Sequence, residues 1–498
     1  MIGYLSHGAK GAVIGAAAGA GGGFLIGHLM DSRRCGLYKI AQANQLNLAS
    51  ASITPGKLGL QGKDANSAIG LDVQLQNKSD EFEVGSSKLT RAARAYLAQI
   101  AQLYAPQAVA AGLPASASPQ ERQQATQHSV LIVGHTDAQD ATSGADLARL
   151  SQERAKAVAD VFAQNGVPAS NIYYQGAGDA LPLMSNTTQQ GREANDRVQI
   201  VDVPTQGDLQ LYLQRRGANP ANFDHVATMA GHAAENTGAD TSASRDGAAL
   251  PTANTSDTPA PQTQASTRGS AAKQAAVAAQ SPSAVAKPPR SIAATAPVQT
   301  ARNAPAQRSV HAGSYDFGGG PIHPPGEPIN LGAAVDHSMF SLITSAHADT
   351  PVIVGSCLSD HPHPTTPVRN LKTAQELPPR DFARGFYGTV WGTNANGNLV
   401  AITGATIPLD AGAPIPRPTV LIYRNYQGNV HQAPSFKGQA NVNVYRGTQK
   451  TVYRVFIDGP ARCLDLVVAD AQFKGQGNLY YDDNGSAFLA TPEFAMQR

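Results

Sequence analysis

Between residues 70 and 204 the sequence alternates between strand-like and helix-like hydrophobic patterns, which constrains the fold more than any other feature. Residues 70–77 alternate with period two, whereas residues 86–104 carry apolar side chains on one helical stripe: Leu89, Ala93, Leu97, Ile100 and Leu103. The pattern continues with a buried strand, a helix and two more strands, at residues 128–135, 145–166, 171–178 and 196–203. This order predicts a β-α-β-α-β-β sandwich with its helices on one face of the sheet.

Polar residues collect where the strands of this unit end. Thr136 and Asp137 leave a central strand, and Arg154 lies on the next helix. Asn195 and Arg197 precede the last strand, on the same rim if the topology holds. A lone Asp–Arg pair is usually a structural salt bridge, but polar clusters on loops more often bind ligands. One anion beside several cations suits a zwitterion that carries an ammonium and a carboxylate.

Three motifs of this unit resemble the OmpA-like peptidoglycan-binding domain: VGHTD at 133–137, LSQERAKAV at 150–158 and GREANDRVQI at 191–200. The resemblance extends over about residues 70–204. In that family an Asp in the strand-exit loop and an Arg of the following helix clasp diaminopimelate of the peptidoglycan stem peptide. The resemblance assigns these roles to Asp137 and Arg154. It implies that Thr136, Asn195 and Arg197 contribute ligand contacts and rim structure.

The chain departs from the family pattern at several places. The loop after Asp137 is longer than usual, and the expected glycine is displaced to Gly144. Leu147 stands where the family commonly has Asn, and Asp196 replaces the first Arg of an Asn-Arg-Arg segment. An insertion at 106–127 precedes the second strand. These changes predict altered affinity or specificity on a conserved fold.

Glycines recur every fourth residue near the start of the chain, at Gly11, Gly15, Gly19, Gly23 and Gly27. On a helix they form a ridge without side chains against which a second helix packs closely, as in membrane proteins. With the following MDSRRCGL, this ridge resembles the leader of glycine-zipper outer-membrane lipoproteins. We therefore expect residues 1–34 to be membrane-associated and to offer a surface for homo-oligomers. A flexible Gly/Ala leader is the alternative, because many glycines weaken helix propensity.

The remaining sequence divides into a linker and a second domain. Residues 205–314 are rich in Ala, Pro, Ser and Thr, and residues 224–314 contain no aromatic side chain. Such a segment buries too little apolar surface to fold, so we expect a disordered linker. Residues 350–498 contain short β-branched and aromatic runs separated by Gly, Asn and Pro. This pattern predicts an all-β sandwich of unknown role.

Two of the three cysteines, Cys357 and Cys463, fall in this C-terminal domain. We expect them to form a disulfide in an oxidising compartment, with two buried thiols as the alternative. His361 and His363 stand beside Asp360 in SDHPHPTTP, which is weak evidence for a metal site. An exposed Pro-rich loop is the better explanation of this spacing. We therefore expect no metal and no cofactor.

The formal net charge of +2, with 15% charged residues, does not indicate the strongly basic surface with which proteins bind nucleic acid. No hydrolase or metalloprotease motif occurs in the sequence. We therefore expect a non-enzymatic protein of the Gram-negative cell envelope, at the outer membrane or in the periplasm, with peptidoglycan and envelope proteins as partners. One alternative is a wall-anchoring subunit of a secretion, conjugation or motor complex. The other is a wall-anchored enzyme with its site in the C-terminal domain.

Overall fold

A computed structural model of the chain describes two folded parts, the α/β domain (residues 22–216) and the β domain (residues 315–497). The described residues are 22–58, 60, 65–76, 81–137, 139, 143–184, 186, 188–216, 315–322, 326–333, 351–410, 412–469, 472–483 and 485–497, with side chains from residue 27 onward. Most of the predicted linker and the first part of the glycine ridge lie outside these residues.

The α/β domain is built on a six-stranded sheet with the strand order β1-β2-β5-β3-β4-β9. Strands β3 and β4 are parallel and their other neighbours are antiparallel. The expected strand and helix order is present. The strands are β1 (Leu48–Ile53), β2 (Gly70–Gln76), β3 (Ser129–His135), β4 (Ile172–Gly176), β5 (Arg197–Val203) and β9 (Arg369–Asn370). The helices are α1 (Gly22–Asn44), α2 (Arg91–Gln102), α3 (Pro106–Gly112), α4 (Pro119–Ala125), α5 (Gly144–Gln164), α6 (Gln189–Asn195) and α7 (Gln206–Arg215), with 3-10 turns η1 (Gly56–Leu58) and η2 (Ala169–Asn171).

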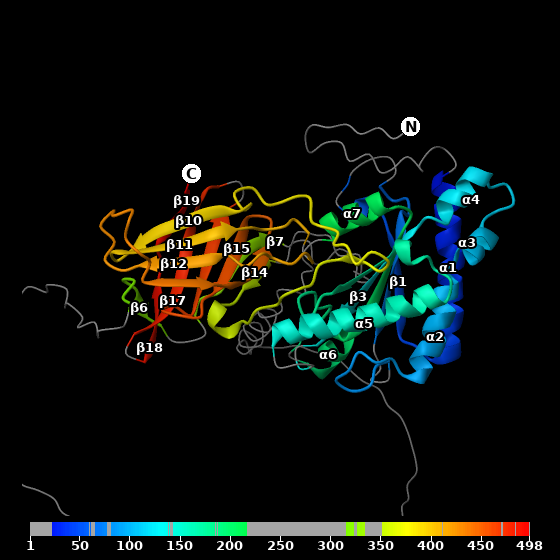
Figure 1. Cartoon of the computed structure of the whole chain (residues 1–498), viewed down its shortest axis with the longest axis horizontal. Coiled ribbons are helices and arrows are strands. Elements are labelled where there is room, and N and C mark those ends of the chain that lie inside the picture. Colours follow the sequence, from blue (N-terminus) through cyan, green and yellow to red (C-terminus); the bar gives the residue numbers. More distant parts are fainter. Residues whose placement is uncertain are drawn as a thin grey trace, which may run out of the picture. The chain divides into compact units, whose positions relative to one another are not determined.

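Helices cover both faces of this sheet, so the expectation of one covered face was wrong. Helices α1, α2 and α5 pack on one face around Leu97, Val158 and Phe162 (Figure 1). On the other face α7 buries Leu209, Tyr212 and Leu213 against β3 and β5. Residues 205–216, which we expected to begin the linker, therefore belong to the domain, because Thr205 caps a helix with a buried apolar side. The insertion at 106–127 forms α3 and α4.

Helix α1 corrects the prediction for the N-terminal segment. Met30 and Leu37 are buried in the core that α2 and α5 share, so residues 27–34 belong to the α/β domain. A Cβ atom added to Gly27 would meet nothing within 4 Å, so none of the helices in the described ranges approaches this glycine closely. None of the described helices has the length and apolar character needed to cross a membrane. Gly11, Gly15 and Gly19 lie outside the described residues.

A buried charge cluster fixes α1 to the sheet. Arg33, which is 3% exposed, forms an ion pair with Asp202 of β5 and lies over the ring of Tyr104, 4.4 Å from its centroid. Asp202 also lies 2.6 Å from Nδ1 of His128. Burial lowers the pKa of Arg33 to about 10, which leaves the side chain charged at neutral pH. The neighbouring Arg34 is partly exposed and takes no part in this cluster.

The β domain is one curled sheet of 11 strands, not the two-layered sandwich we expected. Antiparallel neighbours run from β13 to β14, which are consecutive in the chain, so the sheet bends back on itself around one core that includes Trp391, Tyr453 and Phe494 (Figure 1). Local strand patterns do not specify this closure. The strands of this 11-stranded sheet are β6 (Gly320–Pro321), β10 (Thr389–Ala395), β11 (Asn398–Ala405), β12 (Thr419–Tyr423), β13 (Phe436–Gln439), β14 (Asn441–Arg446), β15 (Lys450–Phe456), β16 (Cys463–Ala469), β17 (Lys474–Asp483), β18 (Ser486–Ala490) and β19 (Glu493–Gln497).

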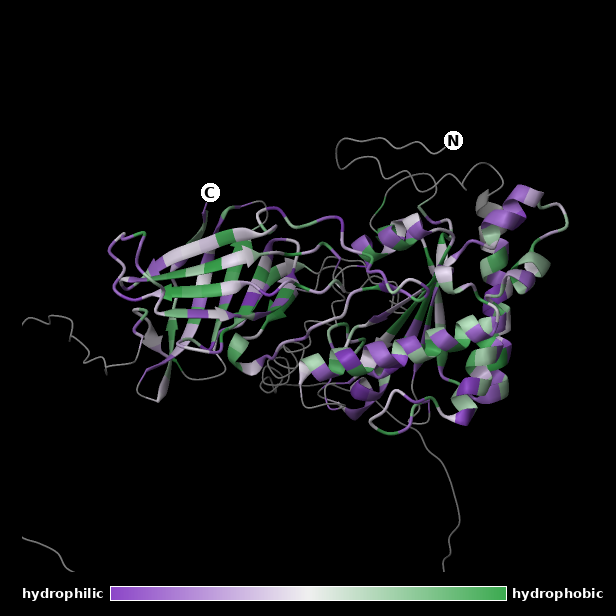
Figure 2. Ribbon diagram, in the orientation of Figure 1, coloured by the Kyte–Doolittle hydropathy of each residue, from purple (hydrophilic) through white to green (hydrophobic). Residues whose placement is uncertain are grey.

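Hydrophobic residues are concentrated along the strands of both domains, whereas the helices carry long hydrophilic stretches (Figure 2).

The β domain begins earlier than residue 350, because β6 pairs with β18 and Phe317 lies in the core. A separate two-stranded sheet pairs β7 (Ile329–Ala333) with β8 (Pro351–Val354) and is followed by the 3-10 turn η4 (Cys357–Ser359).

The segment that follows η4 belongs partly to the other domain. β9 extends the α/β sheet beside β4, and Val368 is buried in the core under α7. The side-chain amide of Gln175 donates to the carbonyl oxygens of Thr366 and Gly412. At the end of α7, Arg216 pairs with Asp410 at 3.0 Å, and both side chains are buried. The two domains are therefore joined by contacts that their sequence separation did not suggest.

The Arg33 cluster predicts a large difference between two adjacent arginines. Arg33→Ala removes one partner of a buried ion pair and should lower the free energy of unfolding by about 3–5 kcal/mol. Arg34→Ala is the matched control and should cost less than about 1 kcal/mol, because surface pairs contribute little. Urea unfolding followed by circular dichroism measures both. Equal effects would show that α1 is not held by this cluster.

Candidate functional site

The predicted rim forms where β3, α5 and β5 come together. Gly134 and Gly176 carry no side chain where α5 crosses β3 and β4, and a Cβ at either position would collide with the α5 backbone at Ser151 or Ala148. His135 is the register partner of Arg197, so Thr136 and Asp196 leave the paired strands at the same edge. The strand-loop-helix geometry expected from the sequence is therefore present.

Arg154 is held at this rim by three groups. Its Nε donates to the carbonyl oxygen of Ser86 at 3.2 Å, and its NH1 forms a 3.0 Å ion pair with Asp196. Its guanidinium carbon lies 5.1 Å from the centroid of the Phe82 ring. The residue is only 4% exposed. Its guanidinium is thus oriented before any ligand arrives.

Asp137 and Thr136 occupy the loop that leaves β3. The carboxylate of Asp137 is half-buried and accepts a 2.6 Å hydrogen bond from the backbone N–H of Gln139. Thr136 is buried, and its backbone N–H donates to the carbonyl oxygen of Gly178. This bond joins the loops that follow the two parallel strands. Through this backbone hydrogen bond Thr136 has a structural role at the rim.

Asn195 and Arg197 are buried structural residues. The side chain of Asn195 accepts from the backbone N–H groups of Leu183 and Met184 and donates to the carbonyl oxygen of Met184 and to Asn186. Arg197 is 4% exposed and donates to Gln74, to the carbonyl oxygen of Asn195 and to that of Leu181. The resemblance implied ligand contacts and rim structure for Asn195 and Arg197, and these hydrogen bonds account for the structural role. Leu147 is 2% exposed and packs in the interior.

The charges at the rim differ from the expectation of one anion and several cations. Asp137 and Asp196 supply two carboxylates, Arg154 of α5 supplies a guanidinium, and Arg192 of α6 donates to the carbonyl oxygen of Asn186. Arg197, expected as a second cation, lies beneath the rim, where burial lowers its pKa to about 9. The substitution that puts Asp196 in place of an Arg thus gives Arg154 an internal partner.

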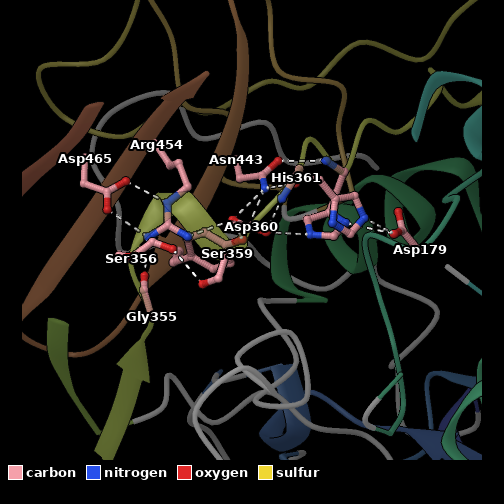
Figure 3. Close-up of polar contacts among 11 residues, drawn as sticks. Asp179, Gly355, Ser356, Ser359, Asp360, His361, Asn443, Arg454 and Asp465 are labelled. Atoms are coloured by element: carbon pink, nitrogen blue, oxygen red, sulfur yellow. Dashed lines mark hydrogen bonds and ion pairs between the residues drawn. The ribbon is translucent and has the colours of Figure 1, made fainter. Parts of the chain in front are cut away.

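A second polar cluster lies beside the loop after β4, and the sequence did not predict it. Nε2 of His361 and Nδ1 of His363 lie 3.1 Å and 3.0 Å from Oδ2 of Asp179 (Figure 3). Asp179 is 3% exposed, and the side chain of His363 is 17% exposed. The prediction of an exposed Pro-rich loop was therefore wrong for His363. Among the described residues, these three have the ligand types and spacing of a metal site.

This cluster continues into the β domain. Nε2 of His363 lies 3.1 Å from Oδ1 of Asp360, and Oδ2 of Asp360 accepts from Arg454, Tyr445 and Asn443. Arg454, which is fully buried, also pairs with Asp465 (Figure 3). Arg454 and Asp465 are register partners on the adjacent strands β15 and β16, whereas Asp179 and Asp360 are far from them in sequence.

Strong electrostatic coupling follows from this arrangement. Burial alone would lower the pKa of His363, but the hydrogen bonds and charges of Asp179 and Asp360 outweigh it and raise the pKa to about 10. Burial alone would raise the pKa of Asp179, yet hydrogen bonds from His361 and His363 hold it well below its usual range. Both carboxylates are thus stabilised as anions.

The predicted disulfide between Cys357 and Cys463 is confirmed. Their Cα atoms are 6.2 Å apart and 106 residues separate them in sequence. The bond ties η4 to β16, directly before Asp360. It therefore fixes the start of the segment that carries His361 and His363.

Comparison with known proteins identifies part of the chain. The model of the OmpA family matches residues 114–196, which confirms the expected OmpA-like domain. The probable lipoprotein YiaD of Escherichia coli is 46% identical over 76 residues, 15% of this chain and 33% of that protein. The peptidoglycan-binding protein ArfA of Mycobacterium tuberculosis is 42% identical over 72 residues, 14% of this chain and 22% of that protein. The chain thus spans a third or less of these relatives.

Among solved structures, the cell wall anchor of the T6SS from Pseudomonas aeruginosa overlaps 36% of this chain and 96% of its own length. The identity is 21% and the TM-score is 0.23. A TM-score of this size carries no argument about function.

The polar layer beneath the rim predicts a pH effect on stability. Burial raises the pKa of Asp72 to about 7, although Gln199, Tyr212, Arg197 and Gln74 oppose this shift. The folded state then binds more protons than the unfolded state above about pH 4. The contribution of Asp72 to stability should therefore fall as the pH rises from 5 to 7, by up to about 1.4 kcal/mol per pH unit, whereas His128 and His135, whose pKa values are lowered by burial, contribute in the opposite direction. Urea unfolding at several pH values measures this contribution as the difference in free energy of unfolding between the wild type and Asp72→Asn. That difference should fall between pH 5 and 7, and a difference that does not change with pH would refute the assignment.

Proposed function

We propose that this chain binds peptidoglycan non-covalently through its OmpA-like domain and so anchors a cell-envelope protein to the wall. The match of residues 114–196 to the OmpA family carries this proposal, because those residues include β3, the Asp137 loop and α5. The relative ArfA is named a peptidoglycan-binding protein, which supports the same ligand class.

We place ligand recognition at Asp137 and Arg154. Diaminopimelate carries an ammonium and a carboxylate at one end of its side chain, and the two rim residues offer the opposite charges. Arg154 is already oriented by Ser86 and Phe82, so little side-chain entropy is lost when it binds a carboxylate. Its planar guanidinium donates in a fork that fits a carboxylate.

Asp196 distinguishes this site from the family pattern. Its carboxylate accepts from Arg154 at 3.0 Å and is itself partly exposed, at 21% for the side chain. A ligand carboxylate must therefore displace Asp196 or share the guanidinium with it. The site binds a single stem peptide more weakly in consequence, and attachment to the wall then depends on several chains acting along the polymer.

The proposed role involves recognition without catalysis. The α/β domain holds the wall, and the β domain is carried with it through the contacts of β9, Thr366 and Asp410. The disulfide suits an oxidising compartment such as the periplasm. Association of the glycines that precede α1 (Gly11, Gly15 and Gly19) with the outer membrane, and self-association through them, are part of this proposal.

A pelleting assay with insoluble peptidoglycan tests the site in the full chain. Asp137→Asn and Arg154→Ala should each weaken binding by at least about tenfold, because each removes a charge-assisted contact of more than about 1.4 kcal/mol. Asp160→Ala and Arg149→Ala are matched controls, since both residues are exposed on α5 and pair only with other α5 residues in the structure's ion pairs.

Circular dichroism must show that all four variants are folded. If the controls pellet like the wild type and the two site variants stay in solution, the rim is the binding site. Pelleting of a folded Asp137→Asn variant at the wild-type level would contradict the proposal.

The competition by Asp196 gives a prediction in the opposite direction. Asp196→Asn removes the negative charge that occupies Arg154 but keeps the size of the side chain. Binding to peptidoglycan should become several-fold tighter, which corresponds to about 1 kcal/mol. The same assay, run over a range of peptidoglycan concentrations, measures the change. Weaker binding by a folded Asp196→Asn variant would show that Asp196 contributes to the ligand site instead.

A further inference from the structure

We propose that Asp179, His361 and His363 form a binding site for a divalent transition-metal ion of the zinc type. The site lies where the loop after β4 meets the segment that follows η4, and it is separate from the wall-binding residues (Figure 3). The proposal does not depend on peptidoglycan binding.

The donor atoms already converge on one point. Nε2 of His361 and Nδ1 of His363 lie 3.1 Å and 3.0 Å from the same oxygen of Asp179, and the three ligand atoms lie within 4.8 Å of one another. In a tetrahedral zinc site with bonds of about 2.0–2.1 Å, neighbouring ligand atoms are about 3.3–3.4 Å apart. The two distances to Asp179 are within a few tenths of an ångström of this value, and rotation of the histidine side chains would close the remaining separation between their nitrogens.

One oxygen of the cluster has no hydrogen-bond partner. Asp179 is 3% exposed, and its Oδ1 is buried without a partner, whereas its Oδ2 faces two imidazoles. An unsatisfied buried carboxylate oxygen is costly. A metal ion that replaces the proton on Nδ1 of His363 compensates that cost, because it neutralises the charge that both oxygens share, and the displaced proton passes to solvent.

The surroundings resemble the outer shell of a metal site. The second nitrogen of His363 faces Asp360 at 3.1 Å, and Asp360 is held in turn by Arg454 and Tyr445. A carboxylate on the remote nitrogen of a ligating histidine fixes the ring and its tautomer. The His-Pro-His spacing brings the ring centroids to 4.2 Å from each other, so both rings face the same carboxylate.

The ligand types select the class of metal. Two imidazole nitrogens and one carboxylate suit zinc and its neighbours in the periodic table, whereas calcium and magnesium prefer oxygen ligands. The side chain of His361 is 49% exposed and that of Asp179 is fully buried, so one side of the cluster faces solvent. Water from that side completes the coordination. The ion would tie residue 179 to residues 361 and 363, which are 182 and 184 positions away in the sequence.

Metal titration of the full chain tests the proposal. All proteins carry Cys35→Ser, because Cys35 is an exposed free thiol that binds zinc by itself. After chelator treatment, competition with a chromogenic zinc indicator should show one tight equivalent in the parent protein. His361→Ala and Asp179→Asn should weaken this binding at least about tenfold, since even loss of an outer-shell partner costs 10–100-fold. His431→Ala changes an exposed histidine elsewhere and should have no effect.

A second readout needs no variant of the cluster. Co²⁺ added to the parent protein should give the intense visible absorption of tetrahedral cobalt, and Zn²⁺ should raise its melting temperature. Absence of a tight zinc equivalent in the parent protein would overturn the proposal, and so would equal affinity in folded His361→Ala. In either case the three residues would be an ion-pair network that joins the two domains without metal.

Discussion

The close approach of α5 to the parallel strands β3 and β4 determines where every functional group of the α/β domain lies. It depends on Gly134 and Gly176, because a side chain at either position would collide with the helix backbone. The approach brings the loops after both strands to one edge, where the backbone of Thr136 bonds to Gly178. Arg154 reaches this edge from α5, and Asp179 reaches it from β4. Both the proposed wall site and the proposed metal site therefore follow from one packing constraint.

Much of this framework could be predicted from the sequence, because local patterns specify it. Alternation of apolar residues located β2, α2, β3, α5, β4 and β5, and the Asp137 loop and Arg154 lie on the elements expected for them. The cysteine pair was also predictable. Arg33 was not, since its partner Asp202 is 169 positions away and nothing in the local pattern distinguishes Arg33 from Arg34. The part of α1 up to residue 34 was accordingly assigned to a membrane-associated segment, although Met30 packs in the core.

The contacts between the two domains could likewise not be predicted from local sequence patterns. β9 is a strand of two residues, and its pairing with β4 has no signature in composition or period. His363 looked like part of an exposed proline-rich loop, because its partner Asp179 lies 184 positions away in the sequence. The curvature of the β sheet was missed for a related reason: period-two alternation gives the buried face of a strand but not whether the sheet closes or stacks.

The proposed attachment to the wall depends most on zwitterion recognition at Asp137 and Arg154. The direct measurement is isothermal titration calorimetry of the full chain with two soluble stem peptides that differ only at the third residue, diaminopimelate in one and lysine in the other. Lysine keeps the ammonium that Asp137 would bind but lacks the carboxylate that Arg154 would bind. The account predicts at least about tenfold tighter binding of the diaminopimelate peptide, which corresponds to about 1.4 kcal/mol. Equal affinities for the two peptides would contradict it.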